Sequence, residues 1–158
     1  LRRNLQRLGM SAELVKIDGR RYRPDDKVDA VLIDAPCSAT GTLRRRPDVP
    51  CHRTSADVDN LAKTQSELLA SAAEWLAPGG CLIYATCSLQ HDEGEAIIDA
   101  FLRRPDNHMT IDPVSSEEAG CFSPALTDIG TLRIVPADFT SLGGVDGFFI
   151  ARLKLSLV

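Results

Sequence analysis

The hydrophobic positions of the chain fall into short unbroken runs and one longer helical stripe. Residues 28–34 end in an apolar run that turns polar at Asp34, and Pro36 cannot donate to a sheet, so a buried strand is predicted there. Residues 81–86 (CLIYAT) form a second apolar run, which ends at Cys87. Further strands are predicted at 13–18, 131–135 and 148–155.

One helix dominates the middle of the predicted structure. From Thr54 to Ala77 the apolar positions recur at alternating spacings of three and four, which predicts a single buried stripe. Thr54 and Asp57 fit an N-terminal capping pair, and Pro78-Gly79-Gly80 ends the helix. Further helices are predicted at 1–8 and 92–104, whereas 35–53 and 105–130 are predicted to be irregular.

This order of strands and helices predicts an α/β fold. Continuously apolar strands are typical of a mostly parallel sheet with helices on both faces. Right-handed crossovers then bring the carboxyl ends of the strands to one edge, where ligands bind in open α/β sheets. We expect Asp18, Asp34 and Cys87 to converge at that edge, with Cys37 in the loop after Asp34.

The thiols at this edge have two interpretations. A thiol near hydrogen-bond donors or positive charge becomes a thiolate, which is a nucleophile. A single cysteine is more often a small buried hydrophobe. Both interpretations stay open for Cys37 and Cys87, and the second is taken for the other three, Cys51, Cys81 and Cys121.

The carboxylates also have structural alternatives. Asp18 precedes Gly19, so turn capping explains it as well as ligand binding does. Asp34 follows four apolar residues, and a carboxylate in that setting needs a partner. The histidines are isolated from one another and are interpreted as surface or helix-start residues: His52, His91 and His108.

Composition and charge narrow the class of protein. The 158 residues are 44% hydrophobic and 25% charged, which is ordinary for one globular domain. No apolar run approaches the ~20 residues of a membrane span. The net charge of −4 argues against nucleic-acid binding by bulk charge. Arginines nevertheless cluster at 2–7, 20–23 and 44–46, which form either a basic face or ordinary solvated surface.

The cysteine count bears on the cellular compartment. Five cysteines is an odd number, and no Cys-x-x-Cys pair occurs. A disulfide framework is therefore not expected, and reduced thiols in the cytosol are. No metal is expected either, because the sequence lacks the paired ligands of a zinc site.

Two cysteine-containing segments resemble conserved motifs of a known enzyme family. Asp34–Gly41 (DAPCSATG) resembles the fourth motif of RNA (cytosine-5) methyltransferases, and Tyr84–Leu89 (YATCSL) resembles their sixth. The segments that flank these motifs are similar too, at Arg44–Asp48, Pro78–Gly80 and Asp146–Ala151. The resemblance spans nearly the whole chain and is closest to bacterial Sun/Fmu-type enzymes, which methylate small-subunit ribosomal RNA.

The resemblance implies a Rossmann-like fold that uses S-adenosylmethionine, and a role for each matching residue. Cys87 would add to carbon 6 of cytosine as the nucleophile. Cys37 would assist breakdown of the covalent adduct and release of the product. Asp34 would contact the base close to the methyl donor, and Asp18 would hold the adenine end of S-adenosylmethionine.

The implied partner is RNA, most closely ribosomal RNA. Arg44 and Arg45 would approach it. The chemistry requires an exposed base face, because carbon 5 of cytosine is a poor nucleophile until a thiolate adds at carbon 6. The target base is therefore expected to be unstacked or flipped out.

Part of the family's pattern has no counterpart in this chain. The glycine-rich donor loop and the acidic residue that grips the ribose precede the matching segments. We therefore expect residues 1–158 to be the C-terminal portion of one methyltransferase catalytic domain, with the first strands and the donor loop missing. Two other interpretations stay open: a non-catalytic RNA-binding or assembly module that keeps the fold, and a redox pair formed by Cys37 and Cys87.

The missing donor loop leads to a first prediction. Calorimetric titration of the 158-residue chain with S-adenosylmethionine should show weak binding or none, and the chain alone should show no turnover. The physical reason is that the contacts of the glycine-rich loop and of the ribose-binding acid would be missing. A dissociation constant in the micromolar range would contradict this expectation.

Overall fold

The computed structural model describes residues 1–157. Its α-helices are α1 (Arg2–Arg7), α2 (Ser55–Ala73), α3 (Glu95–Leu102) and α4 (Ser116–Ala119). Its strands are β1 (Val28–Asp34), β2 (Leu76–Thr86), β3 (Met109–Ile111), β4 (Leu132–Ile134) and β5 (Phe148–Leu155). Its 3-10 helices are η1 (Gly19–Arg21), η2 (Thr40–Thr42), η3 (Val49–His52), η4 (His91–Glu93), η5 (Gly120–Ala125) and η6 (Pro136–Leu142).

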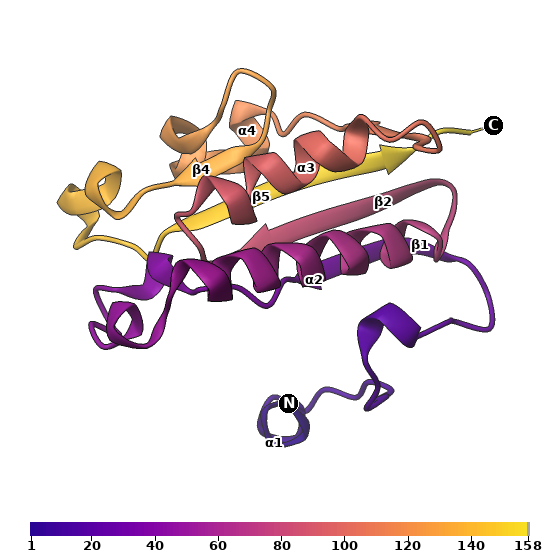
Figure 1. The fold of residues 1–158 in the computed structure, drawn as a ribbon, viewed down its shortest axis with the longest axis horizontal. Helices are drawn as coiled ribbons and strands as arrows, with labels where there is room; N and C mark the ends of the chain where they lie inside the picture. Colours follow the sequence, from indigo (N-terminus) through magenta and orange to yellow (C-terminus); the bar gives the residue numbers. More distant parts are fainter. Residues whose placement is uncertain (158) are drawn as a thin grey trace.

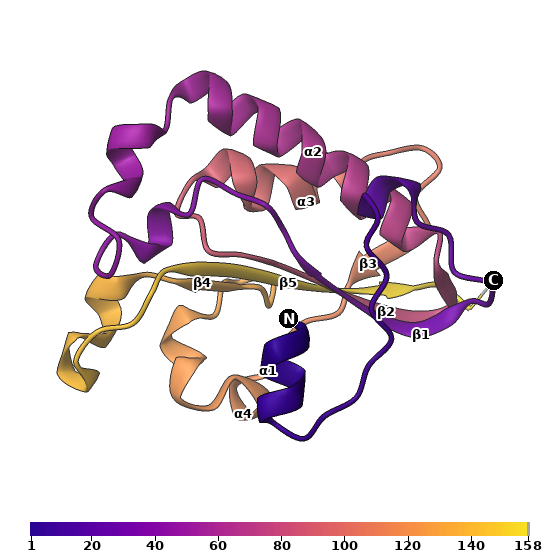
Figure 2. The same ribbon diagram turned by 90° about the horizontal axis from the view of Figure 1, so that it is seen from below.

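The five strands form one mixed sheet in the order β1-β2-β5-β3, with β4 also paired to β5 (Figures 1 and 2). β1 and β2 are parallel, as expected, and their register places Asp34 opposite Ala85. β5 is antiparallel to β2, β3 and β4. The Rossmann-like α/β class is therefore confirmed, but parallel pairing is confined to β1 and β2 because β5 returns beside β2 in the opposite direction.

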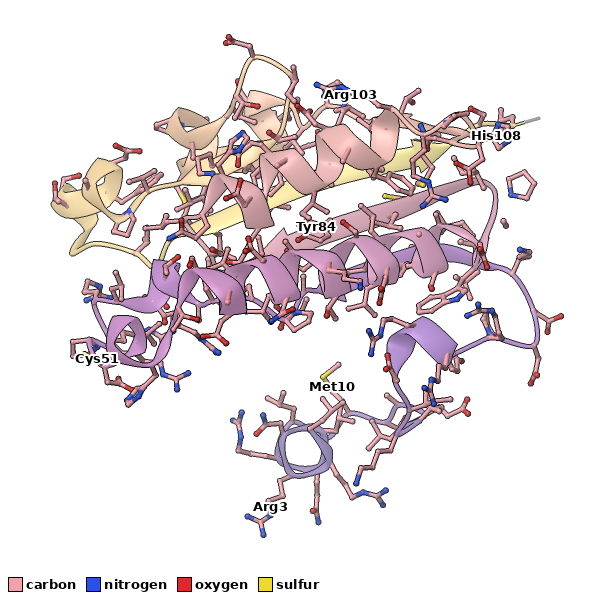
Figure 3. The ribbon with its side chains drawn as sticks, in the orientation of Figure 1. Arg3, Met10, Cys51, Tyr84, Arg103 and His108 are labelled. Carbon is pink, nitrogen blue, oxygen red and sulfur yellow. The ribbon has the colours of Figure 1, made fainter. Side chains whose placement is uncertain are left out.

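The two long helices lie side by side on one face of the sheet. Figure 2 shows α2 and α3 above the sheet and the short helices α1 and α4 on the other side. Figures 1 and 3 show α1 and the segment around Met10 standing apart from the sheet, beyond the β1 edge. Both faces thus carry helices, but only one carries long ones.

Helix α2 begins as its sequence predicts. The Thr54 hydroxyl accepts a hydrogen bond from the Asp57 N–H at 3.3 Å, and the Asp57 carboxylate accepts from the Thr54 N–H at 2.9 Å, which completes the capping box. The helix ends four residues earlier than expected, at Ala73. The reason is that Leu76 already pairs with Val28 at the start of β2.

Two other segments differ from the prediction. The helix expected over 92–104 is interrupted at Gly94, whose backbone (φ −122°, ψ −98°) is not helical, and so splits into η4 and α3. The segment 105–130, expected to be irregular, contains β3, α4 and η5. Their short length hides them from periodicity, although Ser115 and Glu118 form a capping box at α4.

The strand predicted at 13–18 is wrong. These residues pair with no strand of the described chain, and Val15 and Ile17 each keep 52% of their surface exposed. A strand needs a neighbour to bond its backbone groups, and a short β-branched run predicts a strand only where one is present.

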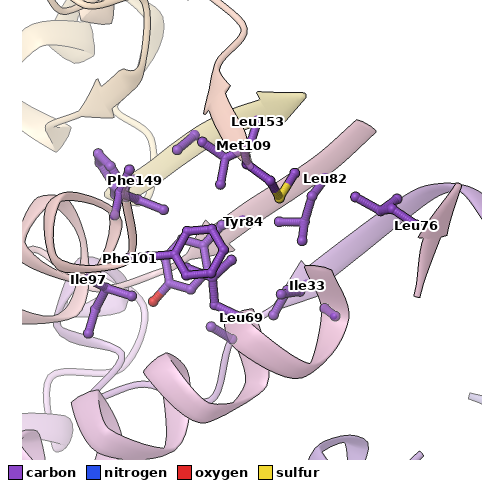
Figure 4. Packing of buried hydrophobic residues seen from close by; sticks show 14 residues of the cluster. Ile33, Leu69, Leu76, Leu82, Tyr84, Ile97, Phe101, Met109, Phe149 and Leu153 are labelled. Atoms are coloured by element: carbon purple, nitrogen blue, oxygen red, sulfur yellow. The ribbon is translucent and has the colours of Figure 1, made fainter. Parts of the chain in front are cut away.

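The core lies between the sheet and the pair α2 and α3. Figure 4 shows Leu69 of α2, Leu82 and Tyr84 of β2, and Phe149 and Leu153 of β5 packed together. These five side chains are at most 1% exposed. β2 runs through the centre of this cluster, with β1 on one side and β5 on the other.

β1 is an edge strand rather than a strand buried on both faces. Among residues 1–157 it pairs only with β2, and Leu32 is 69% exposed while Ile33 is 9% exposed. Apolar strands of parallel sheets are normally covered on both faces. The exposed apolar face of β1 is therefore typical of a surface that further elements cover. Within residues 1–157, every helix is too short or too polar to span a membrane.

The burial difference between neighbouring strands gives a second prediction. Leu82→Ala should lower the free energy of unfolding by about 2–5 kcal/mol, because it opens a cavity in the core. Leu32→Ala, its matched control on β1, should change it by less than about 0.5 kcal/mol. Urea unfolding of the chain measures both, and similar losses for the two variants would show that the core is misassigned.

Candidate active site

The parallel pairing of β1 and β2 brings the two cysteine loops together. Cys37 Sγ and Cys87 Sγ lie 3.4 Å apart, and both residues are half-buried. The Gly41 N–H donates to the Cys87 carbonyl at 2.8 Å, and the Gly147 N–H donates to the Gly41 carbonyl at 2.8 Å. A Cβ on Gly41 would lie 2.7 Å from the Cys87 oxygen and 2.1 Å from the oxygen of Gly147, just before β5, so only glycine fits where these three segments meet.

Backbone strain marks the same loop. Ala39, two residues after Cys37, adopts the left-handed conformation with φ of 60°. For a residue with a Cβ this conformation costs about 1–2 kcal/mol. Strain of this kind persists where surrounding contacts hold it, and such places are often functional sites.

The hydrogen bond between the thiols shifts their pKa values in opposite directions. Donation from Cys87 lowers the pKa of Cys37 to about 6, and the Thr86 hydroxyl and Ala39 N–H act in the same direction. The same bond raises the pKa of Cys87, with further contributions from burial and from the negative charge of Asp34. Donation from Cys87 thus favours the thiolate at Cys37 over the thiolate at Cys87.

Asp34 lies at the end of β1, as predicted, and is exposed. Its neighbour is anchored to β2, because the Ala35 N–H donates to the Ala85 carbonyl at 2.9 Å. Its charge acts on Cys87, so the carboxylate and the two thiols belong to one site.

A buried glutamate beneath the thiols escaped the sequence analysis. Glu93 is 0% exposed. Its Oε2 accepts hydrogen bonds from the hydroxyls of Ser38 and of Ser88, the latter at 2.5 Å. Its Oε1 accepts from the Ser38 N–H at 2.8 Å and from Gln65 Nε2 at 3.1 Å. Four donors thus surround a carboxylate that sits between the two loops.

Gln65 extends this network to helix α2. It is 0% exposed, and its Nε2 also donates to the Pro36 carbonyl at 2.8 Å, one residue before Cys37. The Tyr84 hydroxyl, in the core view of Figure 4, donates to the Glu93 carbonyl at 2.8 Å. A signal existed in the sequence, because a glutamine on an otherwise apolar buried stripe needs polar partners.

The arginines that follow the first cysteine lie at the surface of the site. Arg45 pairs with Asp146 through Nε at 2.7 Å, and its side chain stays 61% exposed. This ion pair lowers the pKa of Asp146. Arg44 is exposed next to Gly144. Both arginines are therefore available to an approaching ligand.

The structure does not bring Asp18 to a strand end, because no strand forms there. Asp18 caps η1 by accepting from the Arg20 N–H at 3.0 Å, and Arg20 Nη2 lies 2.6 Å from its carboxylate. These contacts hold the pKa of Asp18 at about 2. Arg20 also pairs with Glu67 of α2, so the turn-capping interpretation of Asp18 describes its present contacts.

The other cysteines differ from the buried hydrophobes that we expected. Cys51 and Cys121 are exposed, because they lie on η3 and η5 at the surface, and Cys81 is half-buried. Figure 3 shows Cys51 on η3, before α2. The histidines are exposed, in agreement with their surface interpretation. Within residues 1–157, no group of three or more His, Cys, Asp or Glu side chains is arranged to hold a metal ion.

Fold and site define the class of protein. The crystal structure of NSun6 from Pyrococcus horikoshii with SFG superposes with a TM-score of 0.77 at 28% identity, over 98% of this chain and 37% of that one. A methyltransferase homologue from the same organism superposes with a TM-score of 0.71 at 28% identity, over 98% of this chain and 48% of that one. The chain thus has the Rossmann-like fold of methyltransferases.

Comparison with protein families identifies the chain more narrowly than its fold does. Residues 1–154 match the family described as 16S rRNA methyltransferase RsmB/F, and the chain belongs to it. It is 40% identical over 154 residues to ribosomal RNA small subunit methyltransferase B of Citrobacter koseri, covering 95% of this chain and 32% of that protein. It is 36% identical over 157 residues to methyltransferase F of Serratia proteamaculans, covering 98% and 32%. The chain thus spans about a third of the length of these relatives, and the expected Sun/Fmu-type resemblance is confirmed.

The thiol pair gives a third prediction. Alkylation of Cys37 by iodoacetamide, followed by mass spectrometry, should rise with pH through a midpoint near 6, because donation from Cys87 favours the thiolate. Cys87→Ala removes this donor and should move the midpoint upward, toward the ordinary value of about 8.5. The exposed Cys51 serves as an internal reference. An unchanged midpoint in the variant would contradict the assigned hydrogen bond.

Proposed function

We propose that the chain carries the thiol centre of an S-adenosylmethionine-dependent RNA (cytosine-5) methyltransferase that acts on small-subunit ribosomal RNA. The observation that carries this proposal is the pair of thiols at 3.4 Å beside Asp34. Methylation of an exocyclic amine needs no covalent step and therefore no nucleophilic thiol. Two adjacent thiols suit a reaction in which one adds to the base and the other moves protons.

Cys87 is the nucleophile in this proposal. Its proton passes along the existing hydrogen bond to the Cys37 thiolate, and Cys37 then releases the proton to solvent. The Cys87 sulfur forms a bond to carbon 6 of cytosine, and the electron pair of the 5,6 double bond moves toward carbon 5. In this proposal Asp34, which is exposed at the end of β1, lies beside the ring and stabilises the charge that develops on it.

S-adenosylmethionine supplies an electrophilic methyl group when bound, and carbon 5 takes it. Carbon 5 then holds both a methyl group and its original proton. Cys37, again a thiolate, takes that proton while the bond from Cys87 to carbon 6 breaks and the double bond re-forms. The proton returns from Cys37 to Cys87 along the bond that joins them, so the net reaction releases one proton.

The residues present fit part of a donor site. Asp34 offers an exposed carboxylate at the carboxyl end of a strand, where a cationic donor is stabilised. Asp18 is proposed for the adenine end, but Arg20 already holds its carboxylate, so binding there means sharing or displacing that ion pair. The superposing NSun6 structure contains SFG, an analogue of S-adenosylmethionine, which supports this donor.

RNA would approach over the arginines. Arg44 and Arg45 are exposed beside the site, and a cluster of cations on a protein of net charge −4 attracts phosphate locally. The relatives' names, ribosomal RNA small subunit methyltransferase B and F, support ribosomal RNA as the substrate. Thiols that must stay reduced suit the cytosol.

The chain is proposed to be the C-terminal portion of a longer catalytic domain. β1 keeps one edge unpaired among residues 1–157 and leaves Leu32 exposed. Further strands would cover this edge and supply the rest of the donor site. The chain's coverage of about a third of its relatives agrees with this arrangement.

A redox pair is the second candidate, because thiols 3.4 Å apart need only a small movement to form a disulfide. Mild oxidation and peptide mapping test it, and it is discarded if no linked peptide forms. An RNA-binding or assembly module without catalysis would be supported by RNA binding that survives Cys87→Ala in a full-length protein that never methylates.

The fourth prediction separates the two thiols. In the full-length protein, Cys87→Ala should abolish methyl transfer, because no thiolate then adds at carbon 6. Cys37→Ala should leave addition possible but block its reversal, so a covalent protein–RNA adduct should accumulate on a denaturing gel. Cys121→Ala, on the exposed η5, is the matched control and should turn over normally. Normal turnover by Cys87→Ala would refute the assignment.

A further inference from the structure

Two Cys-Ser dipeptides converge on one buried carboxylate. Cys37 and Cys87 are each followed by a serine, and both serines are 0% exposed. Glu93 Oε2 accepts from the hydroxyl of Ser38 and from that of Ser88. One carboxylate therefore anchors the neighbour of each thiol, although the two thiols come from different strands.

We propose that Glu93 is a positioning residue, which holds the two thiols at the 3.4 Å separation needed for proton transfer between them. It is fully buried and bonds to the serines that follow the two thiols. The consequence for proton transfer between the thiols rests on the proposed function. The geometric consequence, a fixed pair of adjacent thiols, does not depend on methyl transfer and can be measured without it.

One consistent set of hydrogen-bond directions has Glu93 as the acceptor throughout. When Ser38 and Ser88 both donate to its carboxylate, the Ser88 oxygen is left to accept from the Thr40 hydroxyl at 3.2 Å. The Thr40 oxygen then accepts from the Leu89 N–H at 2.9 Å. Every member of this buried chain has a partner, and the chain crosses from the first loop to the second.

The other end of the carboxylate fixes the first loop to helix α2. Glu93 Oε1 accepts from the Ser38 N–H at 2.8 Å and from Gln65 Nε2 at 3.1 Å. On the second loop, Arg133 Nη1 donates to the Ser88 carbonyl at 2.9 Å. The backbone next to each thiol is thus fixed by hydrogen bonds to side chains of other elements.

Glu93→Gln is the informative substitution. It keeps the size of the side chain but replaces one acceptor oxygen with an NH₂ donor. The NH₂ group faces either the two serine hydroxyls, which must then turn to accept from it, or the Ser38 N–H, which cannot accept. Each orientation weakens the hold of residue 93 on a Cys-Ser dipeptide, and the thiols are expected to move apart. Asp92→Asn is the matched control, because it neutralises an exposed carboxylate one residue away.

Phenylarsine oxide measures the spacing of the thiols in the chain itself. Its oxygen leaves as water with the two thiol protons, and its arsenic forms one bond to each sulfur, so tight capture requires adjacent thiols. Capture by Glu93→Gln, in competition with a soluble dithiol, should be about tenfold weaker than that by the wild type. Capture by Asp92→Asn should equal the wild type, and Cys37→Ser should abolish it.

Circular dichroism establishes that each variant is folded. Wild-type capture by a folded Glu93→Gln variant overturns the proposal. If that variant does not fold, Ser88→Ala decides, because it removes one anchor and leaves the carboxylate in place. Ser88→Ala should weaken capture of phenylarsine oxide about threefold, because the spacing of the two thiols is then held less tightly. Capture equal to that of the wild type would then overturn the proposal.

Kinetics of the full-length protein separate positioning from simple stability. Glu93→Gln should lower kcat about 100-fold with KM for RNA nearly unchanged, because the reacting groups are misplaced while the RNA surface is intact. Weak capture with wild-type kcat would refute the positioning role. If Glu93→Gln weakens capture but the wild-type protein does not methylate RNA, the proposed function is refuted and the positioning geometry stands.

Discussion

The parallel pairing of β1 with β2 is the constraint on which the site depends. It sets the ends of the two strands side by side, so that the loops after them run together and the Gly41 N–H of the first donates to the Cys87 carbonyl of the second. Two thiols that are 50 residues apart in sequence thereby reach 3.4 Å. The antiparallel β5 completes the arrangement, because Phe149 at its start pairs with Thr86 just before the second thiol.

Strand pairing alone leaves the loops free to move, and the buried carboxylate removes that freedom. Burial of Glu93 is costly, since removing a charge from water needs full compensation by hydrogen bonds. Its four donors supply that compensation, and they come from both cysteine loops and from α2. Loss of one partner from such a network costs about 1–3 kcal/mol. The same contacts that offset burial therefore also make one loop arrangement much more stable than its alternatives.

The sequence predicted the strands and the helix on which the thiols depend, although β2 begins at Leu76, five residues before its expected start at Cys81. β5 has the predicted bounds, the α2 cap is confirmed, and Asp34, Cys37 and Cys87 meet as expected. Their signals are local: an apolar run that ends in polar residues, and a stripe of regular spacing. The resemblance to RNA methyltransferases rested on the same segments, and the family match covers residues 1–154.

What escaped prediction depends on tertiary contacts. The antiparallel direction of β5 cannot be read from its apolar pattern, and the segment 13–18 carries a strand-like pattern without a neighbour to pair with. Asp18 was therefore misplaced along with it. Glu93 looked like one of several acidic residues at a helix start, because only the fold brings both serines to its carboxylate.

The most direct test of this account replaces the target cytidine by 5-fluorocytidine in an RNA substrate of the full-length protein. Fluorine at carbon 5 cannot leave as a proton, so the adduct should persist after methyl transfer. Mass spectrometry of the trapped peptide should then find the methylated, fluorinated nucleotide on Cys87. An adduct on Cys37, or none at all in a protein that methylates the unmodified RNA, would contradict the account.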